Sequence, residues 1–139
     1  MIGAFQATVV SDGPLALGEP SVTLKGMAKD EIGRALTDNC LSPDKIILEQ
    51  NILVLNTGSR LVMFDSGMGT AKMFGATTGR AQRCLEEARI RPAAIDDIIC
   101  THAQFDHVGG LADAKSRRYF PNATIHIAKA DYDFWTDEK

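Results

Sequence analysis

Two unbroken apolar tetrads separated by a short polar segment constrain the fold of this chain more than any other feature. Residues 52–55 and 61–64 are entirely apolar, and they flank residues 56–60, whose Asn, Thr, Gly and Ser are typical of turns. This arrangement predicts a β-hairpin. Because neither tetrad alternates apolar with polar residues, we expect both strands to be buried on two faces of a layered sheet.

The rest of the sequence predicts helices and strands around this hairpin. Before it, we expect a strand over residues 5–10 ending in a Ser-Asp-Gly-Pro turn, a helix over 27–36 and a short strand over 45–49. After it, we expect a helix over 80–89 capped by Thr78, strands over 95–100 and 123–128, and a helix over 129–135. The order strand, helix, strand predicts a crossover between parallel strands, and so an α/β fold with a mixed sheet.

The composition fits one globular domain over residues 1–139 and excludes several functional classes. The chain is 45% hydrophobic and has a formal net charge of -3, so it lacks the basic surface that binds nucleic acid. No apolar run approaches the roughly 20 residues that cross a bilayer, and we expect no membrane partner. The first ten residues do not resemble a signal peptide. We therefore expect a cytoplasmic protein, or a periplasmic one if a leader has been removed.

The three cysteines give no sign of a cross-linked or zinc-bound framework. Cys40, Cys84 and Cys100 are widely spaced and odd in number. We expect reduced and mostly buried thiols. A thiol-dependent activity of Cys100 is a weaker alternative, because nothing in the sequence indicates a lowered thiol pKa.

Metal-ligating residue types gather directly after the strand predicted to end at Cys100. Two imidazoles, a carboxylate and a carboxamide fall within six residues, at His102, Gln104, Asp106 and His107. Imidazole nitrogen and carboxylate oxygen are the ligands that Zn²⁺ and similar ions prefer, and sites of open α/β sheets lie where strands end. From the residues alone, a loop in which Asp106 caps a turn and both histidines are surface residues is equally open.

The pattern His102-x-Gln104-x-Asp106-His107-x-Gly109-Gly110 closely resembles the His-x-His-x-Asp-His signature of the metallo-β-lactamase superfamily. We expect its two glycines to let the backbone turn tightly beneath the polar side chains. Residues 62–69 resemble the aspartate-glycine strand end of the same superfamily. Four further segments are similar to the branch that contains methyl parathion hydrolases and quorum-quenching lactonases: residues 56–58, 74–79, 120–123 and 132–135.

The resemblance implies the first half of a four-layer αβ/βα sandwich, with a binuclear metal site between two similar halves. It implies that His102 and the residue at Gln104 bind one metal, that Asp106 and His107 bind the other, and that one or two Zn²⁺ ions are the cofactor. From the residues alone, Asp65 is equally open to being a turn residue at a strand end, whereas the resemblance implies that it orients a ligand imidazole. In the implied hydrolase, a metal-activated water attacks an ester, lactone or organophosphate bond. Asp106 would orient that water or transfer its proton.

Two departures from the family pattern reduce the number and the strength of the metal ligands that we expect in this chain. Gln104 stands in place of the second histidine, and its neutral oxygen is a weaker zinc ligand than imidazole, so we expect the first metal position to be weakened or lost. The family takes its remaining ligands from the later half. After His107 only His126 could serve, and we expect it to be a structural residue of a strand. The implied ligand set is incomplete, and we expect the isolated chain to be inactive or weakly active.

The alternative is a non-catalytic, truncated half-fold that serves as an assembly or interaction module. The aromatic residues within 131–135 have nothing after them in the sequence that could cover them. A half-sandwich would also expose an apolar face, and such a face drives association. We therefore expect a homo-oligomer, or association with a missing C-terminal half.

Overall fold

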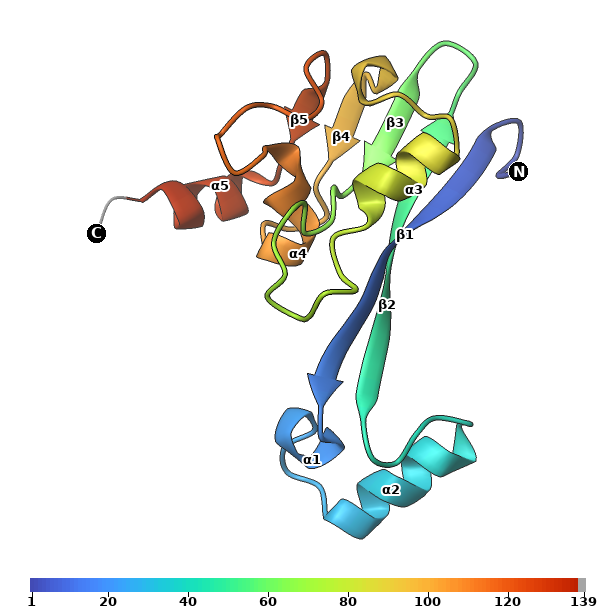
Figure 1. The fold of residues 1–139 in the computed structure, drawn as a ribbon, viewed down its shortest axis with the longest axis vertical. Coiled ribbons are helices and arrows are strands. Elements are labelled where there is room, and N and C mark those ends of the chain that lie inside the picture. The colour runs from blue at the N-terminus through green and yellow to red at the C-terminus, as the bar shows by residue number, and fades with distance from the viewer. Residues whose placement is uncertain (138–139) are drawn as a thin grey trace.

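The computed structural model describes residues 1–137, which form a five-stranded mixed sheet with the strands side by side in chain order (Figure 1). The strands are β1 (Gln6–Gly18), β2 (Ile46–Asn56), β3 (Leu61–Phe64), β4 (Asp97–Ile99) and β5 (Thr124–His126). The first three pair antiparallel, whereas β3, β4 and β5 run parallel. The α/β class with a mixed sheet, predicted from the sequence, is confirmed.

The helices are α1 (Pro20–Thr23), α2 (Lys29–Asp38), α3 (Ala81–Glu87), α4 (Phe105–Val108) and α5 (Lys129–Thr136), with the 3-10 turns η1 (Pro92–Ala94) and η2 (Gly109–Leu111). Three of these helices, α2, α3 and α5, lie close to their predicted positions, whereas the short helices α1 and α4 were not predicted. α3 connects the parallel strands β3 and β4, as the crossover prediction requires. Among residues 1–137, no helix is both long and apolar enough to span a bilayer.

The hairpin of β2 and β3 forms as predicted. Leu53 lies opposite Phe64 in the register, and Asn56 lies opposite Leu61. The turn between them is closed by its polar residues, because the side chain of Asn56 accepts a hydrogen bond of 2.8 Å from the backbone N–H of Gly58. Gly58 has a φ of 90°, a value that L side chains rarely adopt.

The turn predicted after residue 10 is wrong, because β1 continues through it. A register shift between Ser11 and Gly13 marks a β-bulge, which absorbs the φ of 98° at Gly13 without ending the strand. β1 is an edge strand, so Pro14 removes no bond from the interior of the sheet. The separate strand predicted over residues 45–49 is likewise part of β2. Beyond the sheet, β1 and β2 form a two-stranded arm that carries α1 and α2 (Figure 1).

The bulge turns Asp12 into the interior, where its side chain is 0% exposed. Its Oδ2 accepts a hydrogen bond from the N–H of Met68, and its Oδ1 accepts one from Ala81, both 2.8 Å long. Asp12 therefore connects β1 to the loop after β3 and to the start of α3, where a negative charge is favourable. Thr78, the predicted cap of this helix, instead donates its hydroxyl to the carbonyl of Gly75.

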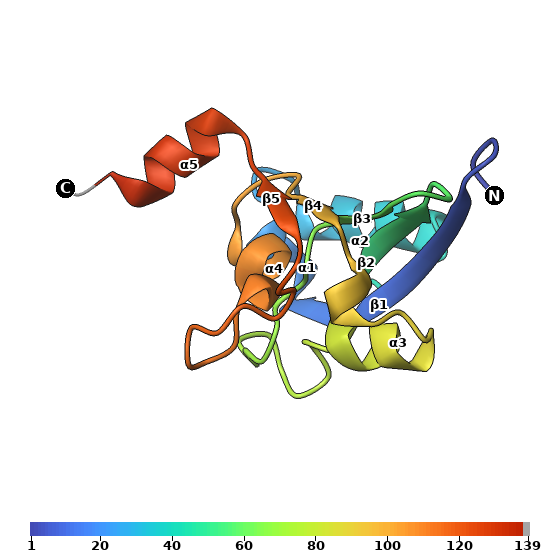
Figure 2. The same cartoon turned by 90° about the horizontal axis from the view of Figure 1, so that it is seen from above.

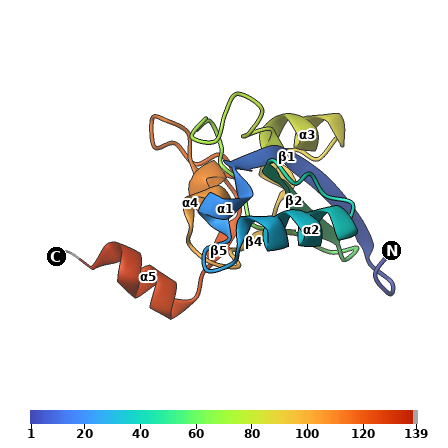
Figure 3. The same ribbon diagram turned by 90° about the horizontal axis from the view of Figure 1, so that it is seen from below.

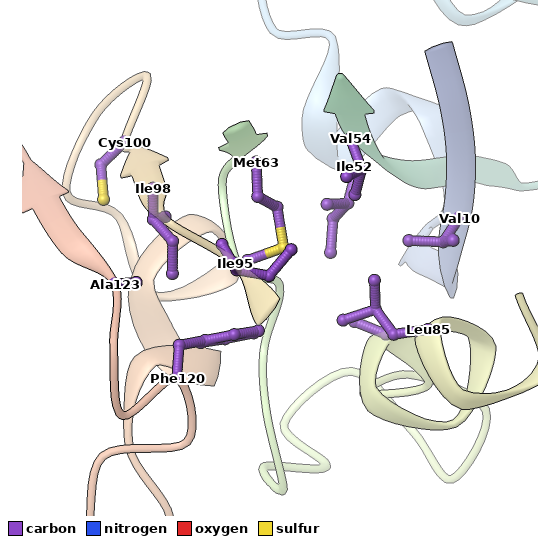
Figure 4. Packing of buried hydrophobic residues seen from close by; sticks show 11 residues of the cluster. Val10, Ile52, Val54, Met63, Leu85, Ile95, Ile98, Cys100, Phe120 and Ala123 are labelled. Carbon is purple, nitrogen blue, oxygen red and sulfur yellow. The ribbon is translucent and has the colours of Figure 1, made fainter. Parts of the chain in front are cut away.

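The hydrophobic core lies between α3 and one face of the sheet. α3 and α4 lie on the same side of the sheet (Figure 2). Side chains of four strands point toward Leu85 of α3, Ile95 and Phe120, and they come from Val10, Ile52, Val54, Met63 and Ile98 (Figure 4). These side chains alternate along each strand with those of the opposite face.

The other face of the sheet is partly exposed, which contradicts the expectation that both hairpin strands are buried on two faces. The strand registers place Val9, Leu53, Phe64 and Ile99 in one row, which we call the open row. Val9 is 63% exposed and Ile99 is 37% exposed, while the other two are half-buried among residues 1–137. An apolar row of this kind is unusual on a surface that only water contacts.

The C-terminal aromatic residues are exposed, as the sequence predicts. α5 stands away from the sheet (Figure 3), and Tyr132, Phe134 and Trp135 are each more than half exposed. The expectation for the thiols is only partly correct. Cys100 is buried and Cys84 is half-buried, but Cys40 is exposed at the end of α2.

Replacing Asp12 with asparagine tests the role of its carboxylate. Asparagine preserves the shape but turns one acceptor oxygen into an NH₂ group that faces a backbone N–H. We expect the free energy of unfolding to fall by about 1 to 3 kcal/mol. Urea denaturation followed by circular dichroism measures this loss, and Asp44→Asn at an exposed position is the control. Equal losses of unfolding free energy in the two variants would show that the buried carboxylate of Asp12 contributes no more to stability than the exposed one of Asp44.

Candidate metal centre

The candidate site forms where two neighbouring parallel strands end. β3 ends before Asp65, and β4 ends just before Cys100 and Thr101. The N–H of Asp65 donates to the carbonyl of Ile99 at 3.0 Å, which holds the two strand ends together. Asp65 has a φ of 61°, in the left-handed region, so its side chain points across to the loop after β4. Polar side chains commonly gather at this edge of an α/β sheet.

His107 is held by the carboxylate of Asp65. Its Nδ1 lies 2.9 Å from Asp65 Oδ2, and because a carboxylate only accepts hydrogen bonds, this nitrogen carries the proton. The other ring nitrogen, Nε2, lies 3.4 Å from Asp106 Oδ2. The lone pair of Nε2 is then on the side of Asp106. In the carboxylate–histidine–metal arrangements of zinc proteins, a carboxylate holds the histidine in the way that Asp65 holds His107 here. The structure places Asp65 beside the His107 ring, and its predicted role behind a metal ligand stays a prediction.

The other two motif side chains form a second pair beside the first. His102 Nε2 lies 3.1 Å from Gln104 Oε1. The rings of His102 and His107 are in contact, with 3.8 Å between their centroids. The structure therefore brings together all four side chains that the sequence singled out as metal ligands.

The distance within each pair can be compared with the distance between two ligands of one divalent cation. With zinc–ligand bonds of about 2.0 to 2.1 Å, two ligands of a tetrahedral ion are about 3.3 to 3.4 Å apart. The Asp106–His107 pair fits this separation at 3.4 Å, whereas the His102–Gln104 pair is slightly closer, at a hydrogen-bond distance of 3.1 Å. Each pair supplies two ligands, whereas zinc sites use three or four protein ligands. Among residues 1–137, no three His, Cys, Asp or Glu side chains come together closely enough to hold a metal ion.

Two residues that the sequence did not single out also contact the site. Thr101 donates to Asp65 through its backbone N–H at 2.7 Å and through its hydroxyl. Gln50 of β2 directs its Nε2 toward Asp106 Oδ2 at 3.5 Å, and its buried Oε1 has no hydrogen-bond partner within the described part of the chain. Thr101 could have been found from its place next to the motif. Gln50 is 56 residues from Asp106, and no local pattern connects the two.

A cleft of about 190 Å³ opens beside Asp106 and His107. Leu15 and Leu48 line one wall of it, while Gln50 adds an amide group. Ligand sites usually combine apolar walls with a few polar groups in this manner. The cleft lies on the side of the site that faces the arm.

Close backbone packing holds the motif in place. The N–H of Ser66 donates to the carbonyl of His107 at 2.7 Å, and the N–H of Gly110 donates to Gly67 at 2.8 Å. A Cβ atom at Gly110 would lie 2.1 Å from the carbonyl oxygen of Ser66. Neither Gly109 nor Gly110 has a positive φ. The glycines are needed because two backbones approach each other, and not for the tight turn expected from the sequence.

Two other residues considered from the sequence lie outside this arrangement. Burial raises the pKa of the Cys100 thiol, which disfavours the thiolate that the alternative thiol activity would need. His126 lies in β5, and its Nε2 is 2.9 Å from Asp97 Oδ1. This hydrogen bond, together with one from Arg60, lowers the pKa of the Asp97 carboxyl. The strand role expected for His126 agrees with this pairing.

The chain belongs to the metallo-beta-lactamase superfamily, whose family model matches residues 47–139. Among curated proteins, the probable metallo-hydrolases Rv2300c of Mycobacterium tuberculosis and Mb2322c of Mycobacterium bovis are each 29% identical over 103 residues. These matches cover 62% of this chain and 31% of each relative. The chain thus spans about a third of the length of these relatives.

Solved structures show the same fold over nearly the whole chain. AidC, a dizinc quorum-quenching lactonase in complex with a product, is 31% identical with a TM-score of 0.86, and the match covers 97% of this chain and 45% of AidC. The hydrolase AbOPH is 25% identical with a TM-score of 0.86, over 99% of this chain and 46% of AbOPH. The structure therefore matches about half of the metallo-β-lactamase fold, as the sequence resemblance implied.

A pair of glycine-to-alanine variants tests the close packing behind the motif. Gly110→Ala forces a methyl group against the backbone of Ser66, and we expect the free energy of unfolding to fall by about 1 to 3 kcal/mol. Gly33→Ala is the matched control, because Gly33 lies inside α2 with open space around it. There we expect a gain of about 0.5 to 1 kcal/mol. Thermal or urea unfolding measures both, and a stable Gly110→Ala protein would contradict the packing.

Proposed function

We propose that this chain forms part of the active site of a metal-dependent hydrolase that cleaves ester, lactone or organophosphate bonds. The observation that carries the proposal is the arrangement of the motif side chains in two pairs, one beside the other. One member of each pair is an imidazole, and Asp65 holds the His107 ring from behind. The similarity to the lactonase AidC and to the hydrolase AbOPH supports a hydrolytic activity, with a lactone among the bonds considered.

His102 and Gln104 would hold one divalent cation, and Asp106 and His107 would hold a second. The chemistry that such cations supply when bound is activation of a water molecule and stabilisation of negative charge at a carbonyl or phosphoryl centre. Asp65 keeps the proton of His107 on Nδ1, so that Nε2 would be free to bind the cation. Asp106 would also orient the attacking water or carry its proton to the leaving group.

The cleft beside Asp106 favours a substrate that carries apolar groups. Leu15 and Leu48 would contact the alkyl or acyl part of an ester, lactone or organophosphate, while the reacting centre lies at the polar end. The neutral oxygen of Gln104 makes the first cation position the weaker of the two. We therefore expect the position of Asp106 and His107 to fill first.

A non-catalytic role in assembly is a second candidate, supported by the open row. Val9 and Ile99 are apolar and exposed, and burial of such a row against another layer would release its water. In that role the chain would associate with another copy or with a chain that supplies a second layer.

Sedimentation of the purified chain tests the assembly role. It should show a dimer or a larger species, and a stable monomer would contradict this candidate.

Metal analysis tests the hydrolase proposal. We expect the purified chain to bind a divalent metal such as Zn²⁺ stoichiometrically, and His107→Ala to abolish binding because it removes a ligand. His126→Ala is the matched control, since His126 pairs with Asp97 in β5 and should leave metal binding unchanged. Elemental analysis and zinc titration measure both. Wild-type protein that binds no metal, freshly purified without chelator, would contradict the proposal.

The substitution Gln104→His tests the weakness of the first position. An imidazole in place of the amide supplies a stronger ligand to zinc, and we expect the metal content per chain to rise. The same elemental analysis measures the change. An unchanged metal content would show that Gln104 does not limit this position.

A further inference from the structure

We propose that Thr101 is a positioning residue that fixes the tautomer of His102, and that it thereby connects both imidazoles to the single carboxylate of Asp65. The inference rests on the proposed metal site, and it adds a function for a residue that is not itself a ligand. Thr101 precedes His102 and follows the buried Cys100, just after β4 ends.

The hydroxyl of Thr101 lies among four polar atoms of three side chains. Its oxygen is 2.9 and 3.0 Å from the two carboxylate oxygens of Asp65. It also lies 3.2 Å from Nδ1 of His102 and 3.2 Å from Nδ1 of His107. One hydroxyl thus contacts both imidazoles on the side away from their Nε2 atoms.

The direction of each hydrogen bond follows from the number of protons available. A carboxylate cannot donate, so the one hydroxyl proton of Thr101 goes to Asp65. The lone pairs of the Thr101 oxygen then remain to accept a proton, and Nδ1 of His102 faces them. His107 donates its own Nδ1 proton to Asp65 Oδ2.

This network leaves Nε2 of each histidine without a proton. For His102, the bare Nε2 then faces Gln104 Oε1, and both atoms offer lone pairs to a cation. The oxygen of Gln104 by itself would favour the opposite tautomer, in which Nε2 carries the proton. Thr101 is therefore needed to keep the proton of His102 on Nδ1 against the opposite preference of Gln104. His107 does not need Thr101, because the carboxylate of Asp65 itself accepts its Nδ1 proton.

The backbone and side chain of Thr101 can be tested separately. Its N–H donates to Asp65 Oδ1 at 2.7 Å, and this bond persists in any variant other than proline. The side chain is exposed, so valine should fit without disturbing the core. Valine has the same shape without the hydroxyl, and serine retains the hydroxyl with a smaller side chain.

The ¹⁵N shifts of the histidine rings in the metal-free chain provide the first measurement. We expect His102 to be protonated at Nδ1 in the wild type and in Thr101→Ser, and to change to the Nε2-protonated form in Thr101→Val. His126, which pairs with Asp97 in β5, is the internal control and should not change. The same tautomer of His102 in wild type and Thr101→Val would overturn the inference.

Zinc affinity, measured by competition with a chelator, provides the second measurement. Residues that orient metal ligands typically change affinity by 10- to 100-fold, and we expect a loss of at least about tenfold for Thr101→Val. Thr101→Ser should bind within about threefold of the wild type, and matching circular dichroism spectra would show that both variants are folded. Equal affinity in Thr101→Val and wild type would also overturn the inference.

The two measurements separate the inference from the proposed function. If wild-type protein binds no zinc, the proposed metal site fails, while the ring shifts still decide what Thr101 does. If zinc binds and the His102 tautomer is the same in Thr101→Val, the metal site stands and the role of Thr101 is wrong.

Discussion

The parallel pairing of β3 with β4 is the constraint on which the candidate metal centre depends. Parallel neighbours end at the same edge of the sheet, and this places Asp65 beside the loop that begins at Thr101. Only then can one carboxylate accept bonds from a backbone N–H, a hydroxyl and an imidazole in that loop. The crossover through α3 makes the pairing possible, and Asp12 holds the start of that helix against β1.

Sequence patterns predicted the elements whose causes are local. The β2–β3 hairpin follows from two apolar tetrads and a polar turn, and the helices α2 and α3 follow from apolar periodicity. The four motif residues also lie together in space, because their spacing places them in one loop and one turn of helix. What these residues bind remains a prediction. The superfamily resemblance read from that spacing is confirmed by the family match.

The features missed in the sequence depend on contacts between distant segments. Asp12 bonds residues 56 and 69 positions away, and nothing in a Ser-Asp-Gly-Pro segment distinguishes a bulge from a turn. The two predicted strands leave Gln50 and Asn51 between them, although β2 runs through both residues. Gln50 is polar because it faces the cleft beside Asp106, which no short window of sequence contains.

Because the backbone of Asp65 is left-handed, a stability measurement would understate the importance of its side chain. For an L residue this conformation is unfavourable by about 1 to 2 kcal/mol, and glycine would adopt it without strain. Exchange for glycine would relax the main chain while deleting the anchor of His107, so the two effects would partly cancel in a melting curve. Selection for thermal stability alone would therefore accept a glycine that removes the carboxylate from the site. At this position, stability and function favour different residues.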